Sequence, residues 1–358
     1  MNPLRILTWA HFWRSVLIFS LAIGGFVYAA VLIVDPYDTV FFSPPLNRAP
    51  VTTNQRFSYP ALARKAKFDS AMVGTSMTRL LKPSDFNRTL GGAFVNLSMN
   101  SAMAWEQSQI LGLFARHHRR ARSVIFGLDG TWCAMGKPPA KLTFRPFPPW
   151  MYDENRWNDL LYLFNLKTLE QLGLQVAWLL GDAPPRRGLD GYTDFLPPRT
   201  AYDLARARTY IYGRPTPIRR PSVIPPYRPT EAERLGWVYP THALLRAMLA
   251  GLPQKTIKIL VFVPYNHYRQ PQRGSRAAAQ LRECKRRITA LAGQFENSHV
   301  LDFMIESAIT RVDANYWDLL HFDTTVATRL ATLIAEGVRQ RRGQGDLFRY
   351  LSTRDFAE

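Results

Sequence analysis

Three residues that lie far apart in the sequence could together perform nucleophilic catalysis. Ser76 ends the apolar run FDSAMVGTS in a small turn, and Asp318 and His321 lie in the C-terminal segment DANYWDLLHFDTTVATRLA. A serine hydroxyl is a weak nucleophile unless a base takes its proton, and a histidine oriented by a carboxylate is such a base. Their spacing puts Asp318 and His321 on one face of a helical turn. We therefore predict that Ser76 is a nucleophile, His321 its general base and Asp318 the residue that orients the imidazole.

Each of these motifs also has a simpler interpretation. Ser76 could only cap a helix, because serine is a favoured residue at that position. His321 could pack beside Trp317 and Phe322, with Asp318 in solvent. The catalytic hypothesis therefore requires that the fold bring the two motifs together.

The elements that must position these residues alternate between apolar runs and helical patterns. The apolar runs are continuous, as is typical of strands buried on both faces of a parallel sheet. The alternation predicts an α/β fold, with an open five-stranded parallel sheet between layers of helices. Ser76 would then lie at the carboxyl end of the first strand, where such sheets bind ligands. The predicted strands lie in residues 68–76, 93–99, 123–129, 257–265 and 299–304, and the predicted helices cover about residues 104–116, 230–252, 275–295 and 324–341.

An insertion separates the third and fourth predicted strands. The third run ends at residue 129 and the fourth begins at residue 257, which is more chain than one crossover helix requires. We expect the insertion at about residues 132–240. Within it, residues 157–180 have helical spacing, and the charged Lys167 and Glu170 favour a packed helix over a second membrane segment.

The N-terminal region contains a candidate membrane span. Residues 16–34 read VLIFSLAIGGFVYAAVLIV without a charge, close to the roughly twenty residues that a helix needs to cross a bilayer. Arg5 and Arg14 precede this run and Asp35 and Asp38 follow it. Because positive flanks stay in the cytoplasm, we expect a single-pass anchor of the inner (cytoplasmic) membrane, with its N-terminus inside and its domain in the periplasm. A cleaved signal peptide would have a shorter apolar region, and a buried core helix would be apolar on one side only.

The predicted organisation follows from these segments. We expect a membrane anchor over residues 1–38, a linker over residues 39–60, an α/β domain over residues 61–345 and a C-terminal tail over residues 346–358.

The charge of the chain indicates its class of partner. The sequence has 46 Lys and Arg residues against 27 Asp and Glu residues, a formal net charge of +19 that belongs almost entirely to the exported part. Such a charge attracts anionic lipid, acidic polysaccharide or nucleic acid. Nucleic acid is not expected, because the arginines are scattered and no helix-turn-helix or zinc-finger pattern is present.

The two cysteines leave two possibilities open. Cys133 and Cys284 could form one disulfide in an oxidising compartment or remain two isolated thiols. Their spacing is not that of a metal site, and we expect neither a metal nor a cofactor.

The serine and histidine motifs together resemble those of the SGNH (GDSL-type) hydrolase superfamily. Gly74-Thr75-Ser76 is similar to the motif that ends the first strand in this superfamily, and Asp318-Leu319-Leu320-His321 is similar to its C-terminal Asp-x-x-His. The resemblance covers about residues 68–340 and includes the order of the strands. It implies an SGNH, flavodoxin-like α/β fold with a Ser-His-Asp triad.

The sequence departs from this superfamily at the residues that would bind an oxyanion. The glycine expected after the second strand is missing from NLSMNSAM, where Ser98, Asn100 or Ser101 could offer a backbone N–H. The asparagine expected after the third strand is replaced by Asp129, which is an acceptor when ionised. Asp129 could orient a sugar hydroxyl or cap the following turn. His267, in VFVPYNHY, could contact substrate or be a surface histidine.

The single anchor and these departures make the chain similar to membrane-tethered members of the superfamily. Those members work beside membrane-bound O-acyltransferases in alginate acetylation or in D-alanylation of lipoteichoic acid. The resemblance implies a serine acyltransferase or esterase that O-acylates an acidic or neutral cell-surface polysaccharide through an acyl-serine intermediate, with a membrane-bound O-acyltransferase as partner. Hydrolysis of small esters would differ only in its acceptor.

The missing glycine and asparagine also suggest a different class of function. A catalytically inert scaffold of the same fold could bind polysaccharide or the acyltransferase partner. Reaction of Ser76 with a covalent serine probe would distinguish the two classes.

Overall fold

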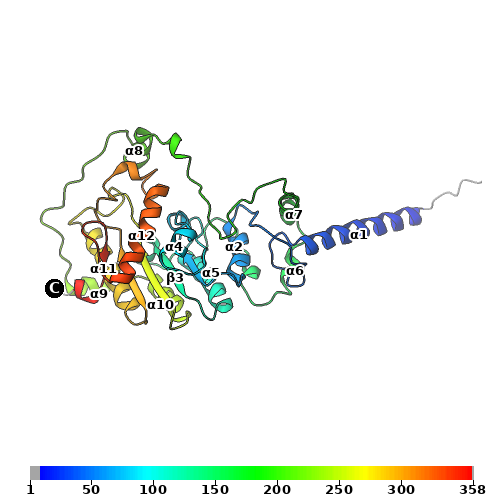
Figure 1. Cartoon of the computed structure of the whole chain (residues 1–358), viewed down its shortest axis with the longest axis horizontal. Helices are drawn as coiled ribbons and strands as arrows, with labels where there is room; N and C mark the ends of the chain where they lie inside the picture. The colour runs from blue at the N-terminus through cyan, green and yellow to red at the C-terminus, as the bar shows by residue number, and fades with distance from the viewer. Residues whose placement is uncertain (1–8, 357–358) are drawn as a thin grey trace, which may run out of the picture. The chain divides into compact units, whose positions relative to one another are not determined.

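The α/β part of the chain is built on a mixed, mostly parallel sheet of six strands in the order β2-β1-β3-β4-β5-β6. Figure 1 labels β3 of this sheet and most of the helices. The structure is a computed structural model that describes residues 9–356. β1 to β5 run parallel, and nearly all of their residues are buried, as expected for strands covered on both faces. The strands are β1 (Ser70–Val73), β2 (Phe94–Asn96), β3 (Ser123–Leu128), β4 (Ile257–Phe262), β5 (Ser298–Asp302) and β6 (Arg349–Tyr350).

The α/β class is as predicted, but the five-stranded sheet needs a correction. β6 is a sixth strand of two residues that runs antiparallel to β5 and pairs Tyr350 with Leu301. The strand predictions depended on continuous apolar runs, and Arg349–Tyr350 is not one. The sheet is therefore mixed at this edge.

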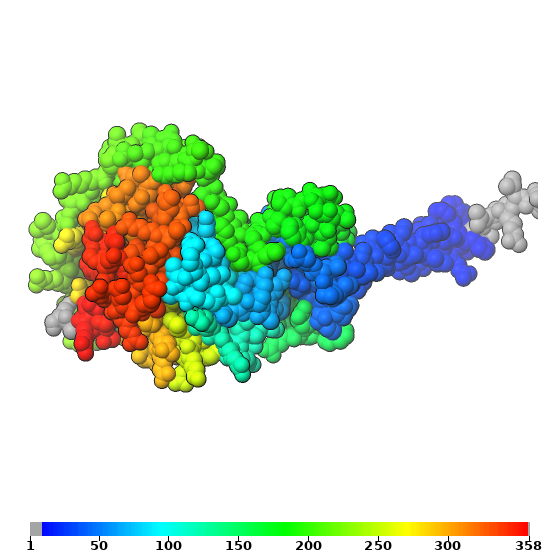
Figure 2. All heavy atoms as spheres, in the orientation of Figure 1, coloured from blue at the N-terminus to red at the C-terminus, as the bar shows by residue number. Residues whose placement is uncertain are grey.

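Two groups of helices cover the sheet. In one group, α10 contacts both α5 and α11, and α5 contacts β1. In the other group, α12 contacts α4 and β5, and these two helices lie side by side on the molecular surface, α12 in orange and α4 in cyan (Figure 2). The long helices are α1 (Trp9–Val34), α2 (Gln55–Arg64), α5 (Ala104–His117), α7 (Leu166–Leu180), α10 (Thr241–Ala250), α11 (Arg276–Ala292) and α12 (Thr324–Gln340), and the short ones are α3 (Ser76–Arg79), α4 (Pro83–Thr89), α6 (Asp159–Tyr162), α8 (Leu204–Tyr212) and α9 (Glu231–Gly236).

Two of the predicted helices are interrupted. The helix expected over about residues 230–252 is divided into α9 and α10, because Pro240 precedes α10 and cannot continue a helix from α9. The helix expected over residues 157–180 is divided into α6 and α7, where the side chain of Asn165 accepts from the backbone N–H of Thr168 and caps α7.

The chain divides into two compact units. The first unit contains residues up to Thr53 together with Pro149–Arg186, and the second contains Asn54–Pro148 together with the chain from Arg187 onward. The inserted segment is thus shared between the units, and the sheet lies wholly in the second. The domain boundaries expected at residues 38, 60 and 345 stay predictions.

The first unit contains α1, which is long and apolar enough to cross a membrane. α1 contacts α7, and the hydroxyl of Tyr28 in α1 donates a hydrogen bond to the carbonyl of Leu160 at 2.9 Å. Arg5, which precedes the apolar run, lies outside the described residues, as do the last two residues of the expected tail.

The second unit contains a disulfide. Cys133 and Cys284 are bonded to each other, with their Cα atoms 5.5 Å apart. The bond joins the short 3₁₀ turn after β3 (Gly130–Cys133) to α11. Of the two possibilities that the sequence left open, the structure has the disulfide.

Candidate active site

Ser76, His321 and Asp318 form a continuous hydrogen-bonded chain. The Oγ of Ser76 lies 2.8 Å from Nε2 of His321, and Nδ1 of His321 lies 2.6 Å from Oδ2 of Asp318. The other carboxylate oxygen of Asp318 accepts the backbone N–H groups of Leu320 and His321, at 2.7 and 2.8 Å. The fold therefore brings together the three residues that the sequence analysis singled out.

The position of Ser76 follows from a close approach between β1 and α3. Ser76 is the first residue of α3, three residues after the end of β1, and Thr75 is the N-cap. A Cβ atom at Gly74 would lie 2.2 Å from Oγ1 of Thr78, so no larger residue fits in this turn without displacing α3. The small turn sets Ser76 at the carboxyl end of β1, where open α/β sheets bind ligands.

The loop that carries His321 is held at both of its ends. An isolated bridge pairs Tyr316 with Phe322, and the backbone N–H of Trp317 donates to the carbonyl of His321 at 2.8 Å. The side chain of Asp323 then caps α12 by accepting from the backbone N–H of Val326 at 2.8 Å. The turn is closed by backbone hydrogen bonds, which fix the imidazole against Ser76.

The electrostatics of the site favour the imidazole tautomer that a general base requires. Burial raises the pKa of Asp318, but the hydrogen bonds from the ring and backbone N–H of His321 and the electrostatic attraction between the two side chains outweigh it, so the pKa lies below its usual value. Asp318 is therefore a carboxylate at neutral pH and accepts the Nδ1–H of His321. Nε2 is then free to accept the proton of Ser76.

A loop of the insertion covers the imidazole. The ring of Phe195 contacts the ring of His321 edge-on, with centroids 5.7 Å apart. The loop is fixed through its backbone carbonyls. The N–H of Asn96 donates to the carbonyl of Asp190 at 2.8 Å, and the hydroxyl of Tyr59 donates to the carbonyl of Gly191 at 3.0 Å. The sequence analysis assigned this segment no role in the site.

Arg79 is a further residue of the site that the sequence analysis missed. Its side chain is only 3% exposed, and its guanidinium lies over the ring of Phe195 at 4.5 Å from the centroid. Nη1 donates to the side-chain oxygen of Asn100, whereas Nε has no partner among residues 9–356. The sequence feature that could have identified Arg79 is its spacing from Ser76, because residues three apart share a face of a helix.

The candidate donors for an oxyanion are backbone N–H groups. Neither Ser76 nor Asn100 uses its backbone N–H for a hydrogen bond within residues 9–356. The N–H of Met99 donates to the carbonyl of Gly74 at 3.1 Å, which holds Asn100 beside the serine turn. The N–H of Ser98 already donates to the side chain of Asn96 at 3.1 Å, so Ser98 is not such a donor.

Asp129 caps the turn that follows β3 and also contacts the serine turn. Its Oδ1 accepts the backbone N–H of Thr131 at 2.9 Å, and its carboxylate hydrogen-bonds the side chain of Thr75. Burial raises the pKa of Asp129 and outweighs these hydrogen bonds. Of the two roles considered for Asp129, capping of the following turn matches these hydrogen bonds. Asp129 also lies next to Thr75, the residue that precedes Ser76.

His267 makes its contacts elsewhere. Its Nε2 lies 3.1 Å from the hydroxyl of Tyr212, and that hydroxyl donates to Asp313 at 2.7 Å. Burial lowers the pKa of His267. No contact found for His267 within residues 9–356 reaches Ser76, Asp318 or His321.

No metal-binding cluster accompanies these residues. In the described part of the chain, no group of three or more His, Cys, Asp or Glu side chains could hold a metal ion.

No protein-family model matches the chain, and no curated protein matches it. The resemblance to the SGNH superfamily thus stays an expectation from the two motifs.

Proposed function

We propose that this protein is a membrane-anchored, SGNH-like serine acyltransferase or esterase that acts on a polysaccharide outside the cytoplasm. One observation carries the proposal: Ser76, His321 and Asp318 are linked by hydrogen bonds of 2.8 and 2.6 Å. A serine held against a carboxylate-oriented imidazole is the arrangement that nucleophilic acyl transfer needs.

The first half of the reaction forms an acyl-serine. His321 Nε2 takes the proton of Ser76 as Oγ attacks the carbonyl carbon of the acyl donor. The negative charge of the tetrahedral intermediate develops on the carbonyl oxygen, where the backbone N–H groups of Ser76 and Asn100 would stabilise it. The imidazolium then gives its proton to the leaving alcohol, and the acyl group stays on Ser76.

The second half moves the acyl group to an acceptor. A sugar hydroxyl loses its proton to His321 as its oxygen attacks the acyl-serine carbonyl. Collapse of the second intermediate returns the proton to Oγ of Ser76 and releases an O-acylated sugar. If water takes the place of the sugar hydroxyl, the same steps give hydrolysis.

Two features support the location, and a third supports the class of acceptor. α1 is long and apolar enough to cross a membrane. The disulfide between Cys133 and Cys284 is typical of proteins in oxidising compartments such as the periplasm. A formal net charge of +19 suits an acidic polymer as acceptor. A membrane-bound O-acyltransferase as source of the acyl group remains part of the proposal.

A second candidate is an inert scaffold with the same fold. Asp129, an acceptor when ionised, stands where the superfamily places a donor to the oxyanion. Loss of one such donor costs roughly 10² to 10³ in turnover in known hydrolases. A scaffold would keep the hydrogen-bonded chain and lack turnover.

Acyl transfer from p-nitrophenyl acetate separates these functions. The full chain in non-ionic detergent is mixed with the ester and with either a polyuronate or dextran, and both nitrophenolate and acetylated sugar are measured. An acyltransferase forms acetylated sugar, an esterase forms acetate alone, and the Ser76→Ala variant forms neither above background. Ser108→Ala, at a serine of α5, is the control and keeps full activity. Equal rates for the native chain and Ser76→Ala would contradict both enzymatic functions.

A further inference from the structure

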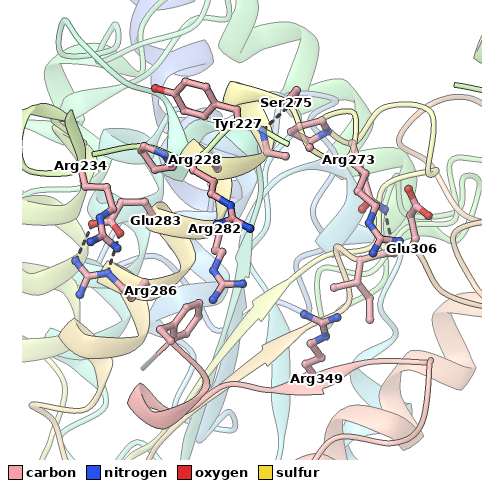
Figure 3. Close-up of a pocket in the computed structure, with 18 of the residues that line it drawn as sticks. Tyr227, Arg228, Arg234, Arg273, Ser275, Arg282, Glu283, Arg286, Glu306 and Arg349 are labelled. Carbon is pink, nitrogen blue, oxygen red and sulfur yellow. Dashed lines mark hydrogen bonds and ion pairs between the residues drawn. The ribbon is translucent and has the colours of Figure 1, made fainter. Parts of the chain in front are cut away.

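A hollow in the second unit, apart from the candidate active site, is lined by arginines. Its volume is about 840 Å³, and none of its lining residues belongs to the Ser76, His321 and Asp318 site. We call it the arginine cavity (Figure 3). Seven arginines line it: Arg228, Arg234, Arg273, Arg282, Arg286, Arg311 and Arg349.

Few of these charges are balanced within the protein. The cavity contains the carboxylates of Glu283 and Glu306. Glu283 accepts hydrogen bonds from Nε and Nη2 of Arg286, each at 2.7 Å. Arg311 pairs with Asp346 at 2.9 Å. Four of the arginines make no ion pair with any of residues 9–356: Arg228, Arg273, Arg282 and Arg349.

The four unpaired arginines come from separate elements and surround one concave space. Arg228 and Arg273 lie in the loops before α9 and α11, Arg282 lies on α11, and Arg349 lies on β6. Figure 3 shows the guanidinium groups of Arg273, Arg282 and Arg349 around the hollow. Ser275, the N-cap of α11, also lines the cavity, so the positive end of this seventeen-residue helix adds to the field.

The density of charge identifies the ligand chemistry. Guanidinium forks bind carboxylates and phosphates in the same bidentate manner. A carboxylate carries one charge, whereas a phosphate monoester carries about −1.5 to −2 at neutral pH. Two phosphoryl groups therefore carry about −3 to −4 and offset most or all of the charge of four guanidiniums in a small space, whereas a polyuronate would need three or four sugar residues to do so. Tyr227 and Phe356 in the wall offer ring faces to the rest of such a ligand.

We propose that the arginine cavity binds a ligand with two closely spaced phosphoryl groups, either a free diphosphate or the headgroup of a phosphorylated lipid. A smaller hollow of about 380 Å³ shares Arg282, Arg349 and Phe356 with it and reaches Lys285. The ammonium of Lys285 is already bound by Asp302, at 2.7 and 2.8 Å, so the binding groups are the arginines. The proposal does not depend on the chemistry of Ser76.

Calorimetric titration of the full chain in non-ionic detergent with inorganic pyrophosphate tests this site. We expect saturable binding that weakens about tenfold in Arg282→Gln and in Arg349→Gln, because each variant loses one charged hydrogen-bonding fork. Arg120→Gln, at an exposed arginine outside the cavity, keeps the native affinity. Unchanged thermal unfolding shows that the variants are folded.

Parallel measurements identify the source of the phosphate. Co-sedimentation with phosphatidylcholine vesicles that contain a lipid diphosphate, if it depends on Arg282 and occurs without binding of pyrophosphate, supports a lipid headgroup as the ligand. Absence of both kinds of binding overturns the proposal, as does equal weakening in Arg120→Gln. Saturation by an oligouronate alone also overturns it, because the ligand would then be a carboxylated sugar.

A different observation concerns α7, whose buried and exposed faces are reversed from those of a helix in water. Its buried residues are Thr168, Gln171 and Gln175. Its leucines at the two ends, Leu166 and Leu180, are 85% and 71% exposed. A helix in a water-soluble protein buries its apolar face.

The exposed face of α7 divides into an apolar and a charged side. At about 100° per residue, Leu166, Val176 and Leu180 fall on one side of the helix. Lys167 and Glu170 fall on another and form an ion pair at 2.6 Å. An apolar side beside a charged side is typical of a helix that lies at the surface of a bilayer.

Contacts within the first unit connect α6, α7 and the residues between them to α1. The rings of Tyr28 in α1 and Phe164 lie 5.7 Å apart, and Leu161 of α6, three residues before Phe164, is 83% exposed. The Nε1 of Trp178 donates to the carbonyl of Asn47 at 2.7 Å, which ties α7 to the segment that leaves α1. We infer that α6 and α7 bind the lipid bilayer at its interface, next to the span formed by α1. This inference rests on the proposed membrane location.

Fluorescence quenching by brominated lipid tests the position of α7. The full chain in proteoliposomes receives one cysteine, either Leu180→Cys or the control Lys167→Cys, labelled with an environment-sensitive dye. Strong quenching at residue 180 and weak quenching at residue 167 is expected. Equal weak quenching at both, with a label at Ile23→Cys in α1 strongly quenched, would overturn the interfacial position while leaving the anchor intact. Absence of quenching at all three would contradict the membrane location itself.

Discussion

At the scale of single residues, the imidazole of His321 has a partner on each ring nitrogen. Asp318 holds Nδ1 at 2.6 Å, and Ser76 lies 2.8 Å from Nε2. A second pair of hydrogen bonds, from backbone N–H groups to Asp318, keeps the carboxylate in place. The imidazole therefore needs no rotation to accept the proton of Ser76.

The departure at Asp129 makes a prediction about rate. In Asp129→Asn, the amide oxygen can still accept the N–H of Thr131, and the amide nitrogen adds a donor near the turn that holds Ser76. We expect hydrolysis of p-nitrophenyl acetate to rise about tenfold, since an added donor stabilises the oxyanion. Initial rates at fixed enzyme concentration measure this effect. A lower rate in the variant would show that the carboxylate itself is required.

The same substitution makes a prediction about stability. Burial raises the pKa of Asp129 above its usual range, so the folded state disfavours the carboxylate. Asp129 therefore makes its full contribution to the free energy of unfolding at a pH below its pKa in the unfolded chain. This contribution is lost as the pH rises through its raised pKa in the folded chain. Asparagine does not titrate, so the melting temperature of Asp129→Asn minus that of the native chain should increase from about pH 4 to about pH 7. A constant difference over this range would contradict the raised pKa.

The sequence was sufficient to single out Ser76, Asp318 and His321 as three residues that the fold brings into one hydrogen-bonded chain, because each has a distinctive type and spacing. Arg79 was missed because its burial and its contact with Phe195 depend on the fold of the insertion. His267 was considered as a substrate contact, yet its hydrogen bond is to Tyr212, which lies in the insertion and had no pattern to link it to His267.

At the scale of elements, the cover of the site depends on Gly191. Its φ of +82° is in the left-handed region, and a Cβ atom there would lie 2.2 Å from the backbone oxygen of Asn96. Gly213 has a φ of +76° with no atom within 4 Å of such a Cβ. The two glycines therefore have the same conformation and different surroundings.

Alanine at each of these glycines distinguishes strain from loss of the cover. Gly213→Ala should lower the free energy of unfolding by about 1 kcal/mol, because only the backbone is strained. Gly191→Ala should lower it by about 3 kcal/mol or more, because the loop must also move away from β2. It should also slow ester hydrolysis by displacing Phe195 from His321. Urea unfolding and initial rates measure both effects, and equal results for the two variants would show that the loop is not part of the site.

Hydropathy alone was enough to find the five parallel strands, since each is a continuous buried run. It did not find β6, which has two residues and one apolar neighbour in β5, Leu301. It also joined α9 to α10 across Pro240, although proline ends helices for a steric reason that apolar spacing does not record. The docking of the insertion loop depends on backbone hydrogen bonds, such as that from Asn96 to Asp190, which any sequence could make.

At the scale of the whole molecule, the disulfide closes a large part of the second unit. The bond joins residues 151 positions apart, across most of the insertion. In the chain-entropy model, closing a loop of this length stabilises the fold by about 5 kcal/mol. Reduction, or the double variant Cys133→Ala and Cys284→Ala, should therefore lower the free energy of urea unfolding by up to this amount. Unchanged stability after both thiols have been shown to be free would contradict the stabilising role.

The proposed function depends most directly on whether Ser76 is a reactive nucleophile. The measurement is covalent labelling of the full chain by a fluorophosphonate, with the modified peptide identified by mass spectrometry. We predict one label on Ser76, no label in Ser76→Ala, and labelling at least about 10³ times slower in His321→Ala. A folded native chain that is not labelled, or that carries its label on another serine such as Ser98, would contradict the account.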